Sequence, residues 1–247
     1  MKAIMLAAGV GSRLYGNDGD KPPKSLLEFG GKTLMRRHIE ALKKFGVKEL
    51  MVVVGFRKDE VMAEAEAHGD GFVSFVENPD FSTTGTTVSL WRAREVLNGG
   101  DAVLFMDADV LYHQELIGRL VKSEHENCII FDHGAAHCLE AVKLCVRDGH
   151  PVAFGKGIEG EFDRTGEWPG FLSLSAAVAG RLASACQAYI DNNKLLEPME
   201  SPLRDVLLGE PQGTFWIEDI TGLPWIEIDF QEDLVRARDY ILPLIGG

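Results

Sequence analysis

The residues best suited to chemistry form a glycine-rich stretch near the N-terminus, with basic side chains close behind it. The stretch reads Leu6-Ala7-Ala8-Gly9-Val10-Gly11-Ser12-Arg13, and Lys24 follows it. Small residues let a backbone approach a ligand closely, and successive N–H groups in a glycine loop form a concavity that binds anions. Arg13 and Lys24 add charge-assisted hydrogen bonds, which are about twice as strong as neutral ones. The stretch therefore predicts a phosphate-binding loop.

This loop is neither of the two common phosphate-binding motifs. It lacks the third glycine of the dinucleotide-binding loop and the Gly-Lys-Ser/Thr of the P-loop. A strand-to-helix turn with solvated charges is the alternative interpretation. The overall charge favours a binding site, because local cations stand out in a chain with a net charge of −13, from 38 acidic and 25 basic residues. The role of Lys21 and of residues 16–20 is left open.

Three aspartates follow apolar runs that are typical of strands. Asp107 comes directly after Met106, Asp109 stands two residues further on, and Asp229 ends a run that begins at Trp225. Asp107 and Asp109 are two residues apart, so in strand geometry they point the same way. Carboxylate oxygens are ligands that magnesium prefers, although an aspartate at a strand end is also a common turn former.

The elements that must position these groups alternate between strand and helix. Apolar and β-branched runs predict strands at residues 2–6, 49–54, 72–76, 102–106 and 128–131, and apolar spacing predicts helices at 33–45, 58–68, 89–98 and 115–125. This alternation is typical of an α/β fold with a mostly parallel, doubly wound (Rossmann-like) sheet. Ligands of such sheets bind beyond the carboxyl ends of the strands.

The pattern changes after residue 131. Short strand-like pieces at residues 142–146 and 171–175, separated by glycine-rich turns, predict a small antiparallel acceptor-binding insertion. Helices are expected at 181–192 and 202–208, and the chain returns to a strand and a helix at 225–228 and 232–241. We interpret residues 1–247 as a single domain, with a nucleotide-binding part over about 1–131 and an acceptor-binding part over about 132–247.

Composition excludes several classes of function. The acidic balance argues against nucleic acid or an anionic membrane as a partner. No apolar run reaches the ~18–20 residues that span a bilayer. The four cysteines show neither disulfide-like density nor a metal-binding spacing. We therefore expect a cytoplasmic protein that binds neither nucleic acid nor membrane; a homodimer is compatible with the sequence.

The motifs together resemble a known family. The glycine stretch with its downstream Pro-Lys-Ser-Leu is similar to the opening signature of nucleotidyltransferases that make nucleotide sugars and CDP-alcohols, and the likeness extends through the segments at Gly55, Met106 and Trp225. The resemblance implies that the loop cradles a triphosphate and that Arg13 and Lys24 neutralise phosphate charge in catalysis. It also implies that Asp109 and Asp229 hold Mg²⁺, with Asp107 on the nucleotide side.

Further segments suggest the two substrates. A Gly85-Thr86-Thr87 turn opens a predicted helix, and in sugar nucleotidyltransferases such a segment contacts the base; helix capping is the alternative. The Ser89-Leu90-Trp91 segment and the Glu-Ile-Asp near Asp229 are most similar to the phosphocholine and phosphonoalkyl branch, which implies CTP as the nucleotide. The alternatives are a sugar-1-phosphate nucleotidyltransferase that uses UTP, GTP or dTTP, and a nucleotide-binding module without turnover.

The acceptor is expected to be a small molecule that carries a phosphate or a phosphonate. Lys143 and Lys156 are candidates for its anionic group. Asp132, Glu167 and Trp168 are candidates for an ammonium head group, through charge and an aromatic face. Hydroxyl groups of an inositol or sugar phosphate would suit the same carboxylates, and the Trp-Pro-Gly turn also fits simple packing.

Overall fold

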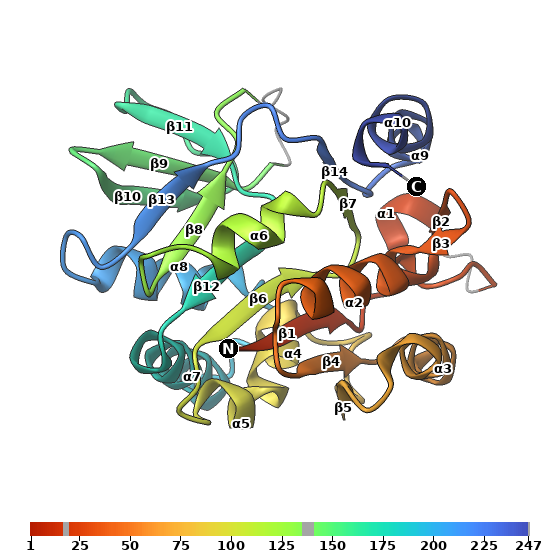
Figure 1. The fold of residues 1–247 in the computed structure, drawn as a ribbon. Helices are drawn as coiled ribbons and strands as arrows, with labels where there is room; N and C mark the ends of the chain where they lie inside the picture. The colour runs from red at the N-terminus through yellow and green to blue at the C-terminus, as the bar shows by residue number, and fades with distance from the viewer. Residues whose placement is uncertain (17–19, 135–140, 247) are drawn as a thin grey trace.

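The computed structural model describes residues 1–16, 20–134 and 141–246 (Figure 1). Part of the loop before Lys21, at residues 17–19, lies outside these ranges, as does Cys138. The three described cysteines are buried free thiols, at positions 128, 145 and 186. Within the described ranges, no helix is long and apolar enough to cross a membrane.

A seven-stranded sheet forms the centre of the fold, in the order β13-β8-β12-β6-β1-β4-β5. Its strands are β1 (Lys2–Ala7), β4 (Leu50–Val54), β5 (Val73–Glu77), β6 (Val103–Asp107), β8 (Cys128–Phe131), β12 (Phe171–Leu174) and β13 (Trp216–Asp219). β12 runs antiparallel to both of its neighbours, and the other pairs are parallel. The predicted mostly parallel sheet is confirmed. The assignment of residues 171–175 to the insertion is wrong, because β12 is a buried central strand.

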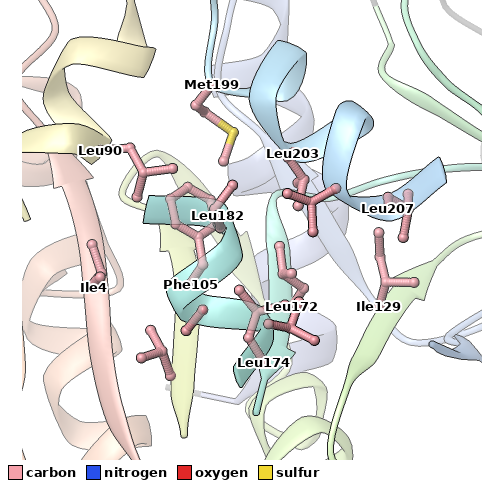
Figure 2. Close-up of a cluster of buried hydrophobic side chains, with 14 of the residues drawn as sticks. Ile4, Leu90, Phe105, Ile129, Leu172, Leu174, Leu182, Met199, Leu203 and Leu207 are labelled. Atoms are coloured by element: carbon pink, nitrogen blue, oxygen red, sulfur yellow. The ribbon is translucent and has the colours of Figure 1, made fainter. Parts of the chain in front are cut away.

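Helices cover both faces of this sheet (Figure 1). On one side lie α2 (Leu34–Lys44), α3 (Lys58–Gly69) and α6 (Glu115–Val121); on the other lie α4 (Thr86–Arg92), α5 (Arg94–Leu97), α7 (Ala176–Asp191) and α8 (Glu200–Gly209). Successive residues of β1 enter opposite cores, as Ile4 and Met5 do, since side chains alternate along a strand. Figure 2 shows Ile4 and Phe105 of neighbouring strands in one cluster with Leu90 of α4 and Leu203 of α8.

Several predicted helices have different limits. The helix expected at 181–192 begins at Ala176, and the one expected at 232–241 ends at Arg236 and continues as a π-helical turn. The helix expected at 89–98 begins at Thr86 and is interrupted at Ala93, and the helix expected at 115–125 ends at Val121. The early start of α4 has a clear cause: the backbone N–H groups of Gly85 and Thr87 donate to the carbonyls of Leu195 and Glu197. The segment before α8 therefore fixes the turn from which α4 begins.

The predicted antiparallel insertion is present as a separate three-stranded sheet in the order β10-β9-β11. It comprises β9 (Lys143–Arg147), β10 (His150–Gly155) and β11 (Arg164–Glu167). Asp148 and Gly149 connect β9 to β10 with positive φ angles of 51° and 73°. An isolated bridge between Asp132 and Glu167 ties the sheet to the end of β8.

Short elements complete the fold around a third, smaller core. They are α1 (Ser12–Tyr15), a 3₁₀ turn (Lys24–Leu26), β2 (Glu28–Phe29), β3 (Lys32–Thr33), β7 (Val110–Tyr112), β14 (Trp225–Glu227), α9 (Gln231–Arg236), a π-helical turn (Ala237–Ile241) and α10 (Leu242–Ile245). The core joins Leu14, Leu111, Ile226 and Ile228, among others. It therefore ties the glycine loop to the β7–β14 pair, which lies far away in sequence.

Replacing Gly85 tests the docking of the α4 turn. A Cβ at this position would lie 2.5 Å from the carbonyl oxygen of Leu196 and still nearer that of Glu197. We expect Gly85→Ala to lower the free energy of unfolding by about 1–3 kcal/mol, the usual cost of overpacking, in urea denaturation. Gly209→Ala is the matched control, because that helical glycine has open space around it. Equal stabilities of the two variants would contradict this account.

Candidate active site

A cavity of about 360 Å³ opens beyond the carboxyl ends of β1 and β6. Most of the residues predicted for the phosphates and the nucleotide line it: Leu6, Ala7, Ala8, Gly9, Gly11, Ser12, Arg13, Lys24, Gly85, Thr86, Asp107 and Asp109. Other residues that were not predicted as site residues also line the cavity, among them Phe81, Ser89 and Glu200. The location agrees with the rule that open α/β sheets bind ligands at this edge.

The glycine loop and Lys24 form one wall. The chain leaves β1, passes through Gly11 with a φ of 72°, and enters the one-turn helix α1. The aliphatic part of Lys24 lies against Gly11, where an added Cβ would be 3.3 Å from its Cγ atom. A larger residue at position 11 would displace the lysine, so the loop and the cation are positioned together.

An ion-pair cluster occupies the floor of the cleft. Lys24 Nζ lies 2.7 Å from Asp229 Oδ1 and 3.0 Å from Asp109 Oδ2, and Arg13 lies 2.6 Å from Asp229 Oδ2. Burial opposes the charge on Lys24, but the two carboxylates outweigh burial and raise its pKa. The structure thus brings together all four residues that were predicted to act on phosphates and metal.

A third carboxylate, which the sequence analysis did not select, joins this cluster. One carboxylate oxygen from each of Asp109, Glu227 and Asp229 lies within 4.8 Å of the others. Burial, followed by the charges of Asp109 and Asp229, raises the pKa of Glu227 to about 8. Three oxygen donors this close fit a hard divalent cation. The signal for Glu227 was its spacing of two from Asp229 along a strand.

Alternation along β14 explains why these acids lie away from the third core, with Glu227 in the cavity wall and Asp229 against Lys24 and Arg13. Ile226 and Ile228 point into the third core, so Glu227 and Asp229 project on the other side. The backbone N–H of Ile228 donates to the carbonyl of Asp109 at 3.0 Å, which holds β14 against the β6–β7 connection. The group of three carboxylates is therefore brought together by pairing between distant segments rather than by a motif in one stretch of sequence.

Asp107 is held by the Trp-Pro-Gly turn. Its N–H donates to the carbonyl of Gly170, and its carboxylate lies where a Cβ of Gly170 would be. Gly170 also has a φ of 89°, so glycine is required there on two grounds. Burial and then the charge of Asp109 raise the pKa of Asp107 well above the usual range.

The predicted base-reading turn divides into two parts. Gly85 and Thr86 line the cavity, whereas Thr87 does not. Thr87 is fully buried, and its hydroxyl donates to the carbonyl of Pro198 at 2.8 Å. The hydroxyl of Thr86 accepts from the N–H of Met199. Thr87 is therefore placed to hold the turn rather than to meet a base.

The predicted acceptor residues are only partly gathered. Asp132 and Glu167 exchange two backbone hydrogen bonds, at 2.8 and 3.0 Å. Burial and then Asp132 raise the pKa of Glu167 to about 7. The indole N–H of Trp225 donates to Asp132 Oδ2 at 2.9 Å. Lys143 of β9 lies opposite Glu167 of β11 in the antiparallel strand register, and the exposed Lys156 follows β10.

The placement of Trp168 on an acceptor surface is wrong. Its side chain is 4% exposed, lies between Phe105 and Phe154, and donates its indole N–H to the carbonyl of Phe171. A large aromatic side chain with a satisfied N–H gains most by such burial. The aromatic residue next to the acidic pair is instead Trp225.

Comparisons with known proteins identify relatives over nearly the whole chain. A family model described as a MobA-like NTP transferase domain matches residues 3–184. The chain is 32% identical to CMP-5'-(3-aminopropyl)phosphonate synthase of Streptomyces rubellomurinus, over 96% of the chain but only 38% of that longer protein. It is 26% identical to CTP:phosphoglutamine cytidylyltransferase of Campylobacter jejuni, over 95% of the chain and 98% of that protein.

One solved structure illustrates the likeness in fold. CTP:phosphocholine cytidylyltransferase from Streptococcus pneumoniae superposes with a TM-score of 0.74 at 21% identity, over 96% of this chain and 97% of that one. At this identity the match concerns the fold. It agrees with the Rossmann-like architecture predicted from the alternation of strands and helices.

The half-buried acid at position 167 predicts a pH-dependent stability. The folded protein keeps a proton on Glu167 up to a pKa of about 7, whereas the ordinary value is 4.5. The unfolded chain releases that proton first, so stability is lost as the pH rises from 4.5 through 7. Glu167→Gln removes this loss. At about pH 8 we expect its Tm to exceed that of the wild type by about 2–4 °C, which corresponds to ~1 kcal/mol after allowance for solvent screening.

Calorimetry over a pH series checks this. The Tm difference should vanish at about pH 4, where the glutamate is protonated in both states. Glu124→Gln, at an exposed glutamate, controls for the loss of one negative charge. A difference that is equally large at both pH values would contradict the assignment.

Proposed function

The chain belongs to the MobA-like NTP transferase family, as its motifs led us to expect, and on this premise we propose that it is a Mg²⁺-dependent cytidylyltransferase. An oxygen of the acceptor's phosphate or phosphonate attacks the α-phosphorus of CTP. The bond between the α-phosphorus and the bridging oxygen to the β-phosphate breaks. The products are a CDP-alcohol or a CMP-phosphonate, and pyrophosphate leaves with the electron pair.

The observation that carries this proposal is the cluster at the floor of the cleft. Asp109, Glu227 and Asp229 lie together, with Lys24 and Arg13 against them and the glycine loop beside them. Nucleotidyl transfer needs positioning and charge neutralisation more than covalent help from the protein. Phosphate-binding cations next to oxygen ligands for a metal supply both.

Each group has a distinct task in the proposed reaction. Asp109 and Asp229 are the proposed metal ligands, with Glu227 as a further carboxylate and Asp107 on the nucleotide side. A Mg²⁺ ion held by these carboxylates would supply Lewis-acid chemistry that offsets the charge developing during displacement. The glycine loop would donate N–H groups to the triphosphate. Arg13 and Lys24 would exchange their carboxylate partners for phosphate oxygens.

The proposal for CTP is supported by the two relatives whose names specify CMP or CTP chemistry. In this chain the base would lie at the end of the cavity formed by Gly85 and Thr86, with Phe81 and Ser89 nearby. Thr87 would support that turn from behind. We therefore propose that the first part of the chain, about 1–131, makes most of the contacts with the nucleotide.

The acceptor would lie along the exposed face of β14. Trp225 and Glu227 are two residues apart on this strand, so their side chains share a face. Because the indole N–H of Trp225 donates a hydrogen bond to Asp132, the Asp132–Glu167 pair extends that face on the side away from Asp109 and Asp229. An acceptor with an ammonium group would suit these carboxylates and the indole. Lys143 and Lys156, in the part after residue 131, remain proposed contacts of its anionic group.

A pyrophosphate-release assay tests the reaction. The protein with Mg²⁺ would be given CTP, UTP, GTP, ATP or dTTP in turn, with phosphocholine, phosphoethanolamine, 2-aminoethylphosphonate, inositol-1-phosphate or glucose-1-phosphate. We expect release with CTP and one of the first four acceptors. Release only with glucose-1-phosphate would identify a sugar-1-phosphate nucleotidyltransferase. Nucleotide binding without release for any acceptor would indicate a non-catalytic module.

Asp109→Ala separates chemistry from folding. Loss of a proposed metal ligand should lower kcat at least about a hundredfold, or ~3 kcal/mol of transition-state stabilisation. The Tm should stay within a few degrees of the wild type, because the substitution also removes repulsion from Asp107 and Glu227. Asp191→Ala, at an exposed site at the end of α7, is the control. Near-full turnover by Asp109→Ala would refute the site.

A further inference from the structure

A buried histidine lies directly behind the group of three carboxylates and has no part in the proposed chemistry. His38 is fully buried on the apolar face of α2, beside Met35, Ile39 and Leu42. A polar ring in such a place is costly unless its nitrogens are hydrogen-bonded. Both ring nitrogens of His38 should therefore have hydrogen-bond partners among the surrounding residues.

Both nitrogens have partners, and the partners fix the tautomer. Nε2 lies 3.1 Å from the carbonyl oxygen of Ala108, and Nδ1 lies 3.0 Å from the hydroxyl of Tyr112. A carbonyl can only accept, so Nε2 carries the proton and donates it. Nδ1 then accepts from Tyr112. Burial lowers the pKa of His38 to about 4, which keeps the ring in this neutral form.

The carbonyl that receives the bond belongs to the loop between the two cleft aspartates. This loop is anchored at each of its three residues by a different segment. The N–H of Asp107 donates to Gly170, the carbonyl of Ala108 accepts from His38, and the carbonyl of Asp109 accepts from Ile228. Of these three anchors, only that from His38 is made by a side chain.

Tyr112 connects two of the anchors. Its ring stacks on His38 with centroids 5.3 Å apart and meets Phe171 edge-on at 5.0 Å. Phe171 directly follows Gly170, which holds Asp107. The aromatic contacts therefore link the α2 side of the loop to the β12 side, and leave the Ala108 peptide little freedom to rotate.

We propose that His38 is a positioning residue for the metal site: oriented by Tyr112, it fixes the Ala108 peptide and so aims the Asp109 carboxylate at Asp229 and Glu227. This inference rests on the proposed function. The loop needs such a restraint because it carries two carboxylates into an acidic cluster whose mutual repulsion favours their separation. Groups that orient metal ligands are worth about 10–100-fold in metal affinity in other proteins.

Mn²⁺ binding to the substrate-free protein tests the inference without relying on turnover. Free Mn²⁺ would be measured by electron paramagnetic resonance during titration of the wild type and of four variants. His38→Leu removes both hydrogen bonds, His38→Gln keeps an amide donor toward Ala108, and Tyr112→Phe removes the partner of Nδ1. Ile39→Ala is the matched control, since it damages the same helix at a fully buried residue that faces the core.

We expect His38→Leu to weaken Mn²⁺ binding about tenfold or more, Tyr112→Phe to weaken it less, and His38→Gln to recover most of the affinity. Ile39→Ala should lower the Tm and leave the Mn²⁺ dissociation constant unchanged. Unchanged affinity in His38→Leu would overturn the inference. If that variant does not fold, unchanged affinity in Tyr112→Phe would do so.

A further variant distinguishes failure of this inference from failure of the proposed function. In Asp109→Ala, Mn²⁺ binding should be lost. If the wild type binds no Mn²⁺, or if Asp109→Ala binds it as well as the wild type does, the metal site is refuted. The positioning role of His38 is then refuted with it. If Asp109→Ala abolishes binding while the His38 and Tyr112 variants bind like the wild type, only the positioning role is refuted.

Discussion

Mutual repulsion among closely spaced and partly buried carboxylates, offset by two cations, is the constraint on which the site depends. Asp109, Glu227 and Asp229 lie within 4.8 Å of one another, and Lys24 and Arg13 neutralise part of their charge. Such a cluster is unfavourable in a protein of low dielectric unless its charges are paired. Packing of the surrounding segments must therefore hold the acids close together against their repulsion. A bound divalent cation would reduce that repulsion.

Packing meets this demand through alternation and strand pairing. Ile226 and Ile228 enter the small third core and so turn Glu227 and Asp229 toward the cleft. On the opposite side, Gly170 and His38 fix the loop that carries Asp109. The acids come from segments more than a hundred residues apart, so the sheet, the third core and the cluster form one cooperative unit.

The sequence predicted the parts of this arrangement that depend on local pattern. Strand-end position identified Asp109 and Asp229, and loop composition identified Arg13 and Lys24. Alternation of strands and helices predicted the parallel sheet. Glu227 was missed because its one local signal, the spacing of two residues from Asp229, does not by itself distinguish a ligand from an ordinary strand residue. Its role depends on the pairing of β14 with β7, which brings distant segments together.

Other errors have the same physical origin. Trp168 stands in a turn, where sequence cannot distinguish a packed aromatic from an exposed one; its stacking on Phe105 and Phe154 decides the matter. Residues 171–174 are central because they insert between β6 and β8, a long-range pairing. In the sequence, His38 occupies an ordinary core position of an amphipathic helix. Its hydrogen bond to the carbonyl of Ala108 becomes visible only in the folded structure.

Anomalous scattering from crystals of the protein with Mn²⁺ and a non-hydrolysable CTP analogue would show whether Asp109 and Asp229 hold a metal ion beside the nucleotide, as we propose. We expect an anomalous peak next to these two carboxylates and the phosphate oxygens, with Lys24 moved from the carboxylates onto the triphosphate. A peak elsewhere in the cleft, with Lys24 still bridging Asp109 and Asp229, would contradict the proposal.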